Sequence, residues 1–179
     1  PLPDLLQRYQ QLLALWPTPL TSALPVNLEL QGVRIEGWLA GLHQRADGGV
    51  LSVTAIPYSI GSIKSRKWHR LIKPWVNHLV ACASGLMLST ALVASDDTLL
   101  LEPMEKDRAA RFLGDLLLAW QASMRQPLPI AVKTAFAWLA QTDPLKAEAA
   151  ARKAYEGDGQ TSEGERRETP ALFRQFADF

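Results

Sequence analysis

The chain has 179 residues, of which 47% are hydrophobic and 21% are charged, and these fractions are ordinary for a folded globular protein. The formal net charge of +1 excludes a global basic field, so any attraction to nucleic acid must come from a local cluster. A single cysteine excludes an internal disulfide, and the absence of a long apolar run or a signal peptide argues against a membrane partner and favours a reducing, cytoplasmic location.

The N-terminal residues predict a helix. Asp4 suits the positive end of a helix, and apolar residues follow at helical spacing until the prolines of residues 17–25 break the pattern. The chain begins with Pro-Leu-Pro and enters this helix directly. We therefore expect one domain over residues 1–179, excised from the C-terminal part of a larger subunit.

Residues 26–56 predict three strands. Apolar and polar residues alternate over residues 26–30, a second strand follows over residues 33–39, and Asp47-Gly48-Gly49 is typical of a hairpin turn. Residues 50–56 are almost all apolar or β-branched, as in a strand that is covered on both faces. We expect a meander of two antiparallel hairpins, with the third strand buried in one sheet.

A long amphipathic helix is predicted over residues 65–84, with Ser65 as its N-cap and Gly85 after its end. Pro74 should kink this helix or start a new one, because it lacks a backbone donor. The residues expected on the buried face recur every three or four positions: Trp68, Leu71, Ile72, Trp75, Val76, Leu79, Val80 and Ala83. Cys82 lies in this apolar pattern and reads as a buried structural thiol.

The remaining chain predicts a second hairpin, with strands over residues 86–94 and 98–101, and then helices. A helix over residues 105–125 should turn its larger apolar side chains inward: Phe112, Leu113, Leu116, Leu117 and Trp120. Residues 130–141 read as irregular or helical. The whole order indicates an α+β fold, one sheet with helices packed against it.

Thr142-Asp143-Pro144 predicts the start of a helix that runs through Tyr155 and ends at Gly157. Residues 157–168 are polar and contain glycine, so we expect a mobile loop. Thr169-Pro170 should begin a last short element that carries Phe173, Phe176 and Phe179.

This order resembles the PD-(D/E)xK, or restriction-endonuclease-like, nuclease core, which implies a mixed sheet with helices packed against it. In active members an acid on the second core strand and an Asp/Glu-x-Lys on the third hold Mg²⁺ and orient water. Here Glu36 occupies the place of the first acid, but residues 51–56 hold neither acid nor lysine. We therefore expect no catalytic residues, metal or cofactor, and a solvated Glu36 paired with Arg34 or another base.

Short motifs in succession resemble the RecC C-terminal domain family: Asn77 to Gly85, Phe136 to Leu139, and Ala154 to Gly157. RecC is the gamma subunit of exodeoxyribonuclease V, the RecBCD helicase–nuclease of double-strand break repair. The resemblance covers roughly residues 25–175 and implies a nuclease fold without nuclease residues, with DNA and RecB-like and RecD-like subunits as partners.

One basic cluster could contact DNA phosphates, because no acid lies between Asp47 and Asp96. Its cations are Lys64, Arg66, Lys67, Arg70 and Lys73, and Tyr58 or Trp68 could stack on a base. The alternative is a solvated basic helix face with Trp68 in the core. His43, His69 and His78 are scattered, and we expect His78 to be a hydrogen-bonded packing residue.

The sequence thus predicts a non-catalytic nuclease-fold domain that guides DNA and docks partner subunits. Two alternatives stay open. One is an active Mg²⁺-dependent nuclease in which Glu29 or Asp47 joins Glu36. The other is a pure protein-interaction module, in which the basic cluster meets an acidic surface. No Gly-x-x-x-x-Gly-Lys motif is present, so we do not expect ATP binding.

Overall fold

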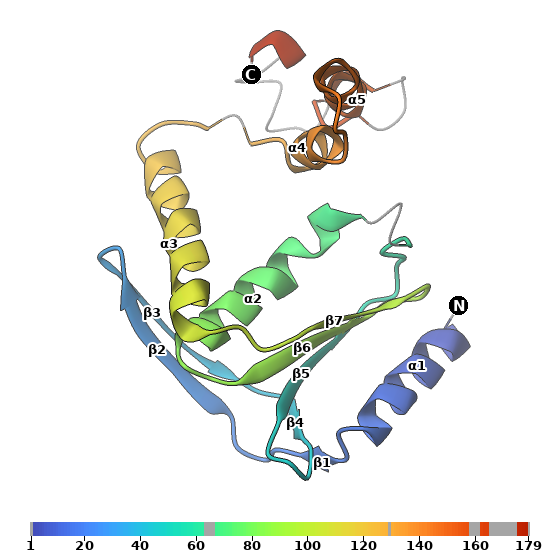
Figure 1. The fold of residues 1–179 in the computed structure, drawn as a ribbon, viewed down its shortest axis with the longest axis vertical. Coiled ribbons are helices and arrows are strands. Elements are labelled where there is room, and N and C mark those ends of the chain that lie inside the picture. The colour runs from blue at the N-terminus through green and yellow to red at the C-terminus, as the bar shows by residue number, and fades with distance from the viewer. Residues whose placement is uncertain (1, 63–66, 129, 158–161, 165–174, 179) are drawn as a thin grey trace. The chain divides into compact units, whose positions relative to one another are not determined.

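The computed structural model describes residues 2–62, 67–128, 130–157, 162–164 and 175–178 (Figure 1). Contacts group the chain into two compact units, Pro1–Trp120 and Gln121–Phe179. The single domain over residues 1–179 stays a prediction.

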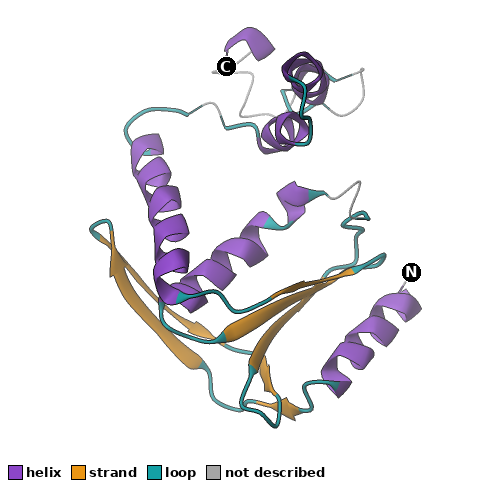
Figure 2. Cartoon of the chain, viewed as in Figure 1, coloured by secondary structure: helices purple, strands orange, loops and turns teal. Residues whose placement is uncertain are grey.

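The first unit holds a sheet, a separate hairpin and helices, which confirms the α+β fold class (Figure 2). Its elements are α1 Leu2–Ala14, β1 Thr18–Pro19, β2 Leu24–Leu30, β3 Val33–Leu39, β4 Leu42–Gln44, β5 Val50–Ala55, the 3-10 turn η2 Trp68–Arg70, α2 Ile72–Ala83, β6 Leu88–Val93, β7 Thr98–Leu101 and α3 Lys106–Ser123, which ends just beyond the unit.

The main sheet is mixed and has five strands in the order β1-β4-β5-β6-β7, with β5 and β6 parallel and the other pairs antiparallel. Strands β2 and β3 form a separate antiparallel hairpin. The predicted single meander is therefore wrong. Gly41, with a φ of 67°, separates β3 from the short strand β4, and β4 is the strand that pairs with β5.

Helices α1 and α2 cover opposite faces of the main sheet (Figure 1). On one face Leu51 and Ala91 pack with Trp16, just beyond α1. On the other face Leu42 and Leu88 pack with Ala81 of α2. These contacts place apolar side chains of β5 on both faces, but the burial predicted for the whole strand is wrong, because Thr54 and Ala55 at its end are exposed.

Helix α2 begins later than predicted, at Ile72, because Pro74 lies in its first turn, where a missing N–H costs nothing. Its end is as predicted. Gly85, with a φ of 86°, closes the helix, and the Leu86 amide donates to the Ala81 carbonyl. Trp68 belongs to η2 and is 46% exposed, so its predicted core position is wrong. Ser65 lies outside the described residues.

A second core joins α2, α3 and the β2–β3 hairpin. Leu79, Cys82, Ala109 and Leu113 are buried there, and Leu28 packs against them. The buried thiol is as predicted. The buried face of α3 runs through residues 109, 113 and 117, in steps of four. Three of the side chains predicted to point inward lie instead on an exposed neighbouring stripe: Phe112, Leu116 and Trp120.

The second unit contains α4 Val132–Leu139, α5 Pro144–Glu156 and a last 3-10 turn, η3 Phe176–Asp178. The predicted start of α5 is confirmed, because the Asp143 carboxylate caps the amides of Leu145 and Lys146 at 2.9 and 3.1 Å. Gly157 ends α5 with a φ of 73°.

Several predictions for the second unit fall outside the described residues: most of the loop 157–168, and Thr169, Pro170, Phe173 and Phe179. Within that loop Ser162 and Glu163 are described, and both are buried. The Glu163 carboxylate accepts hydrogen bonds at the start of α4. The mobility of residues 157–168 stays a prediction.

Candidate functional site

The place where a nuclease centre would lie is defined by β5 and its neighbour β4. The register pairs Leu42 with Ser52, His43 with Leu51, and Gln44 with Val50. Successive side chains on a strand point to opposite faces of the sheet, so these three pairs include side chains on both faces. Neither strand carries an acid or a lysine on either face.

Glu36 lies elsewhere, on β3 of the separate hairpin. Its carboxylate pairs with the Arg34 guanidinium, and both side chains are exposed. The predicted Arg34–Glu36 pair is confirmed. The assignment of Glu36 to the first-acid position is wrong, because the strand next to β5 is β4. Glu29 is the cross-strand partner of Arg34 on the same hairpin.

Asp47 makes its contacts within the turn between β4 and β5. Its carboxylate accepts from the Gly49 amide at 2.9 Å and pairs with Arg45 at 2.8 Å. The Gly49 amide, followed by Arg45, lowers the pKa of Asp47 below its ordinary value. Within the described part of the chain, no group of three or more His, Cys, Asp or Glu side chains could hold a metal ion.

A buried histidine–cysteine pair on α2 was not singled out by the sequence, although its spacing of four residues was a usable signal. The Sγ of Cys82 lies 3.6 Å from Nε2 of His78, and Nδ1 of His78 lies 3.0 Å from the Thr90 hydroxyl. His78 is thus the predicted hydrogen-bonded packing residue.

This pair lacks the properties of a nucleophile. Burial lowers the pKa of His78, against an opposing hydrogen bond with the backbone of Glu102. Burial also raises the pKa of Cys82, against hydrogen bonds with the backbones of Met104 and Leu88. Both groups are therefore uncharged near neutral pH, whereas a reactive cysteine needs the thiolate.

The basic cluster is partly described. Lys64 and Arg66 lie outside the described residues. The Lys67 ammonium donates to the Ser59 hydroxyl at 2.5 Å, and the Arg70 guanidinium donates to the Ser59 carbonyl. These two cations therefore help to hold the loop over residues 57–61.

Aromatic side chains accompany these cations. The Arg70 guanidinium lies 4.7 Å from the centre of the Tyr58 ring, and Tyr58 and Trp68 are each 46% exposed. Lys73 is exposed in the first turn of α2. The structure thus brings Tyr58, Lys67 and Arg70 together around one residue, Ser59.

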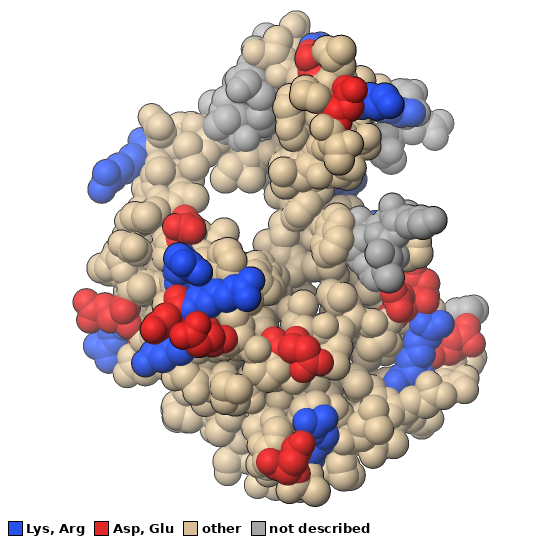
Figure 3. Space-filling model, viewed as in Figure 1, with Lys and Arg blue, Asp and Glu red and all other residues tan. Residues whose placement is uncertain are grey.

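An acid that is distant in sequence joins the cluster. Asp96, in the turn between β6 and β7, accepts from the amides of Ile60 and Gly61 at 2.8 Å each. Desolvation would raise the pKa of Asp96, but these two amides and the charge of Lys67 outweigh it and lower the pKa. The positive charge of Lys67 is therefore opposed by an acid that lies outside the acid-free stretch between Asp47 and Asp96. On the face drawn in Figure 3, acidic and basic side chains likewise lie next to each other.

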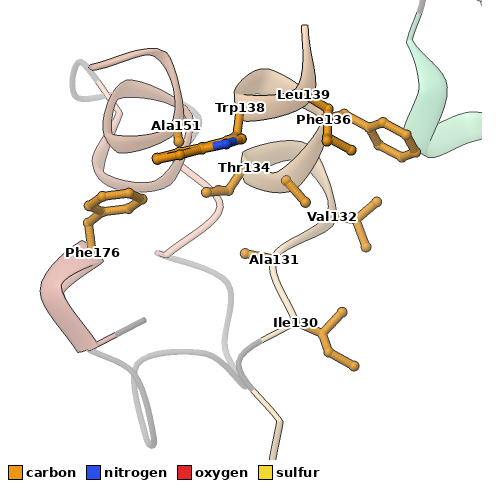
Figure 4. A pocket seen from close by; sticks show the side chains of 10 residues that line it. Ile130, Ala131, Val132, Thr134, Phe136, Trp138, Leu139, Ala151 and Phe176 are labelled. Carbon is orange, nitrogen blue, oxygen red and sulfur yellow. The ribbon is translucent and has the colours of Figure 1, made fainter. Parts of the chain in front are cut away.

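The second unit has an apolar hollow of about 560 Å³ (Figure 4). Its lining comes from α4 and the residues before it, from Ala151 of α5, and from Phe176 of η3. Ile130 and Leu139 on its rim are 65% and 73% exposed. An exposed apolar surface of this kind is typical of a protein-docking site.

Comparison with known proteins gives one family. A model described as the RecC C-terminal domain matches residues 1–143. No curated protein matches the sequence. A solved structure titled "Crystal structure of SSO0001" is 11% identical with a TM-score of 0.38, and the alignment covers 79% of this chain and 67% of that chain. In the described ranges, no helix is both long and apolar enough to cross a membrane.

Proposed function

Because the chain belongs to the RecC C-terminal domain family, and so to a RecC-like subunit of RecBCD, we propose that it is a non-catalytic nuclease-fold domain. Its role is to guide DNA and to dock RecB-like and RecD-like subunits during double-strand break repair. The observation that carries this proposal is the lack of any acid or lysine on β4 and β5.

Metal-dependent hydrolysis of DNA requires hard oxygen ligands at the reacting phosphate. The pairing of β4 with β5 leaves apolar residues, hydroxyls, His43 and Gln44 at this place. The alternative nuclease needs Glu36 with Glu29 or Asp47. Glu36 is engaged with Arg34, and Asp47 is engaged with Arg45 and its own turn.

We expect the purified protein to leave linear duplex DNA and single-stranded DNA intact in Mg²⁺ or Mn²⁺. The physical reason is that neither β4 nor β5 carries a carboxylate that could hold the metal. Gel analysis of end-labelled DNA over several hours measures the result. Cleavage that requires metal and disappears in Glu36→Ala would contradict a non-catalytic role.

For DNA contact we propose Lys67, Arg70 and Lys73, with Tyr58 and Trp68 as stacking partners, and Lys64 and Arg66 from the sequence. A lysine has three donors and an arginine five, so the bonds of Lys67 and Arg70 to Ser59 leave donors for phosphate oxygens. The exposed rings of Tyr58 and Trp68 support stacking on unpaired bases.

Binding to DNA should be independent of sequence and should weaken steeply with salt, because each neutralised phosphate releases a counterion. Lys73→Ala is expected to flatten the slope of log K against log salt by about one unit. Fluorescence anisotropy at several salt concentrations measures the slope. Lys146→Ala, at an exposed lysine on α5, is the matched control and should leave the slope unchanged.

If the cluster instead meets an acidic protein surface, DNA binding is negligible even in low salt, and Lys73→Ala weakens association with partner subunits. Pull-down of RecB-like and RecD-like subunits distinguishes the two cases. The apolar hollow supports partner docking, so Leu139→Asp in the same pull-down should weaken association. An unchanged slope together with unchanged association would leave Lys73 without a role.

A further inference from the structure

Asp96 makes a contact between segments that are far apart in the sequence. It lies 35 and 36 residues from Gly61 and Ile60, and its two carboxylate oxygens each accept one of their amides, at 2.8 Å. Gly61 has a φ of 76°, a left-handed conformation that favours glycine. Consecutive amides that converge on one anion form a backbone nest. Here Asp96 supplies the anion.

The loop held in this way carries the groups that organise the basic cluster. Ile60 is fully buried against Leu71 and Leu92, and this packing anchors the loop of residues 58–61 to the core. The preceding residue, Ser59, accepts hydrogen bonds from Lys67 and Arg70, and Arg70 lies over the ring of Tyr58. The order of contacts therefore runs from Asp96 through the loop backbone to the cations.

We propose that Asp96 is a positioning residue of the DNA-contact surface: it fixes the loop of residues 58–61, and through this loop it sets the places of Tyr58, Lys67 and Arg70. This inference rests on the proposed DNA contact. The change in DNA affinity that it predicts has the opposite sign from the change expected from charge. An acid near phosphates repels them, so its removal should strengthen DNA binding if charge alone matters. Positioning requires the opposite result.

Asp97 provides the matched control, because it is the neighbouring acid and its carboxylate accepts from the amide of the next residue, Thr98, at 2.8 Å. Asp96→Asn and Asp97→Asn remove the same charge from the same turn. Asp96→Asn also replaces one of the two acceptor oxygens by a donor, which breaks the nest. We expect Asp96→Asn to weaken DNA binding by about 3–10-fold, the net value of one ordinary hydrogen bond. Asp97→Asn should bind DNA as tightly as the wild type or more tightly.

Two further measurements complete the test. Hydrogen exchange at the amides of Ile60 and Gly61 should become faster in Asp96→Asn and not in Asp97→Asn. Ser59→Ala removes the hydroxyl acceptor of Lys67 without touching Asp96, and it should also weaken DNA binding, so the inference stays testable if Asp96→Asn does not fold.

The possible outcomes separate the inference from the proposed function. If the wild type does not bind DNA in low salt, the DNA-guiding function is overturned, and this inference with it. If the wild type binds DNA with the expected salt slope but Asp96→Asn binds as well as Asp97→Asn, only the positioning role is overturned. If Ser59→Ala leaves binding unchanged in a folded protein, the step from the loop to Lys67 is overturned.

Discussion

Replacing Leu79 with alanine is expected to destabilise the first unit by about 2–5 kcal/mol, the range for deleting a large buried aliphatic side chain. Leu79 is 0% exposed and lies where α2, α3 and the β2–β3 hairpin meet. Its neighbours come from three elements that are each held by the others. They cannot all move to fill the space, so a cavity will remain in addition to the lost apolar burial.

Urea unfolding followed by far-UV circular dichroism measures the change in the free energy of unfolding. Leu139→Ala provides the control, because the same substitution at a side chain that is 73% exposed should change this free energy by less than about 0.5 kcal/mol. A loss at Leu79 no larger than the loss at Leu139 would mean that α2 does not pack on the hairpin and α3.

Glu163→Ala is expected to destabilise the second unit by about 1–3 kcal/mol, the cost of leaving buried donors without a partner. Glu163 is 6% exposed, and its carboxylate accepts from the amides of Lys133 and Thr134 at 3.2 and 2.9 Å and from the Thr134 hydroxyl at 3.1 Å. The N-cap residue of α4 is Ala131, which has no side-chain acceptor. Glu163 therefore caps the N-terminus of α4, although it lies about 30 residues further along the chain.

Hydrogen exchange at the Thr134 amide and thermal unfolding of the second unit measure this loss. Glu148→Ala is the control, since Glu148 is exposed on α5 and pairs with Arg152 at 3.4 Å, an interaction of small effect. Glu163→Gln keeps one acceptor oxygen and should lie between alanine and the wild type. Equal stability of Glu163→Ala and Glu148→Ala would show that α4 does not depend on this contact.

Local signals in the sequence predicted local structure well. Asp143-Pro144 marked the start of α5, and Gly85 marked the end of α2, because caps depend on residues within one turn of the helix. The turns at residues 47–49 and 95–97 were likewise located correctly. The strength of these signals comes from backbone preferences that do not need the rest of the fold.

Pairing between distant segments was not predictable in the same way. Nothing in the periodicity of residues 33–44 shows that β4, and not β3, pairs with β5, since both readings bury apolar side chains. At the candidate site, the cations and aromatic residues were identified from their spacing. Their partners Ser59 and Asp96 were missed, because the hydrogen bonds that join them to these segments span 8 and 35 residues and leave no periodic pattern in the sequence.

The parallel pairing of β5 with β6 has a consequence for how the chain reaches its folded state. It joins Val50 to Leu88, 38 positions apart (88 − 50), whereas the β2–β3 and β6–β7 hairpins close over short turns. Contacts of high sequence separation form late, because a long segment must lose its freedom first. A nascent chain that ends within α2 thus presents β5 with one unpaired apolar edge, which is the kind of surface that aggregates. Pairing of this edge with Leu88–Val93 of β6 removes the hazard.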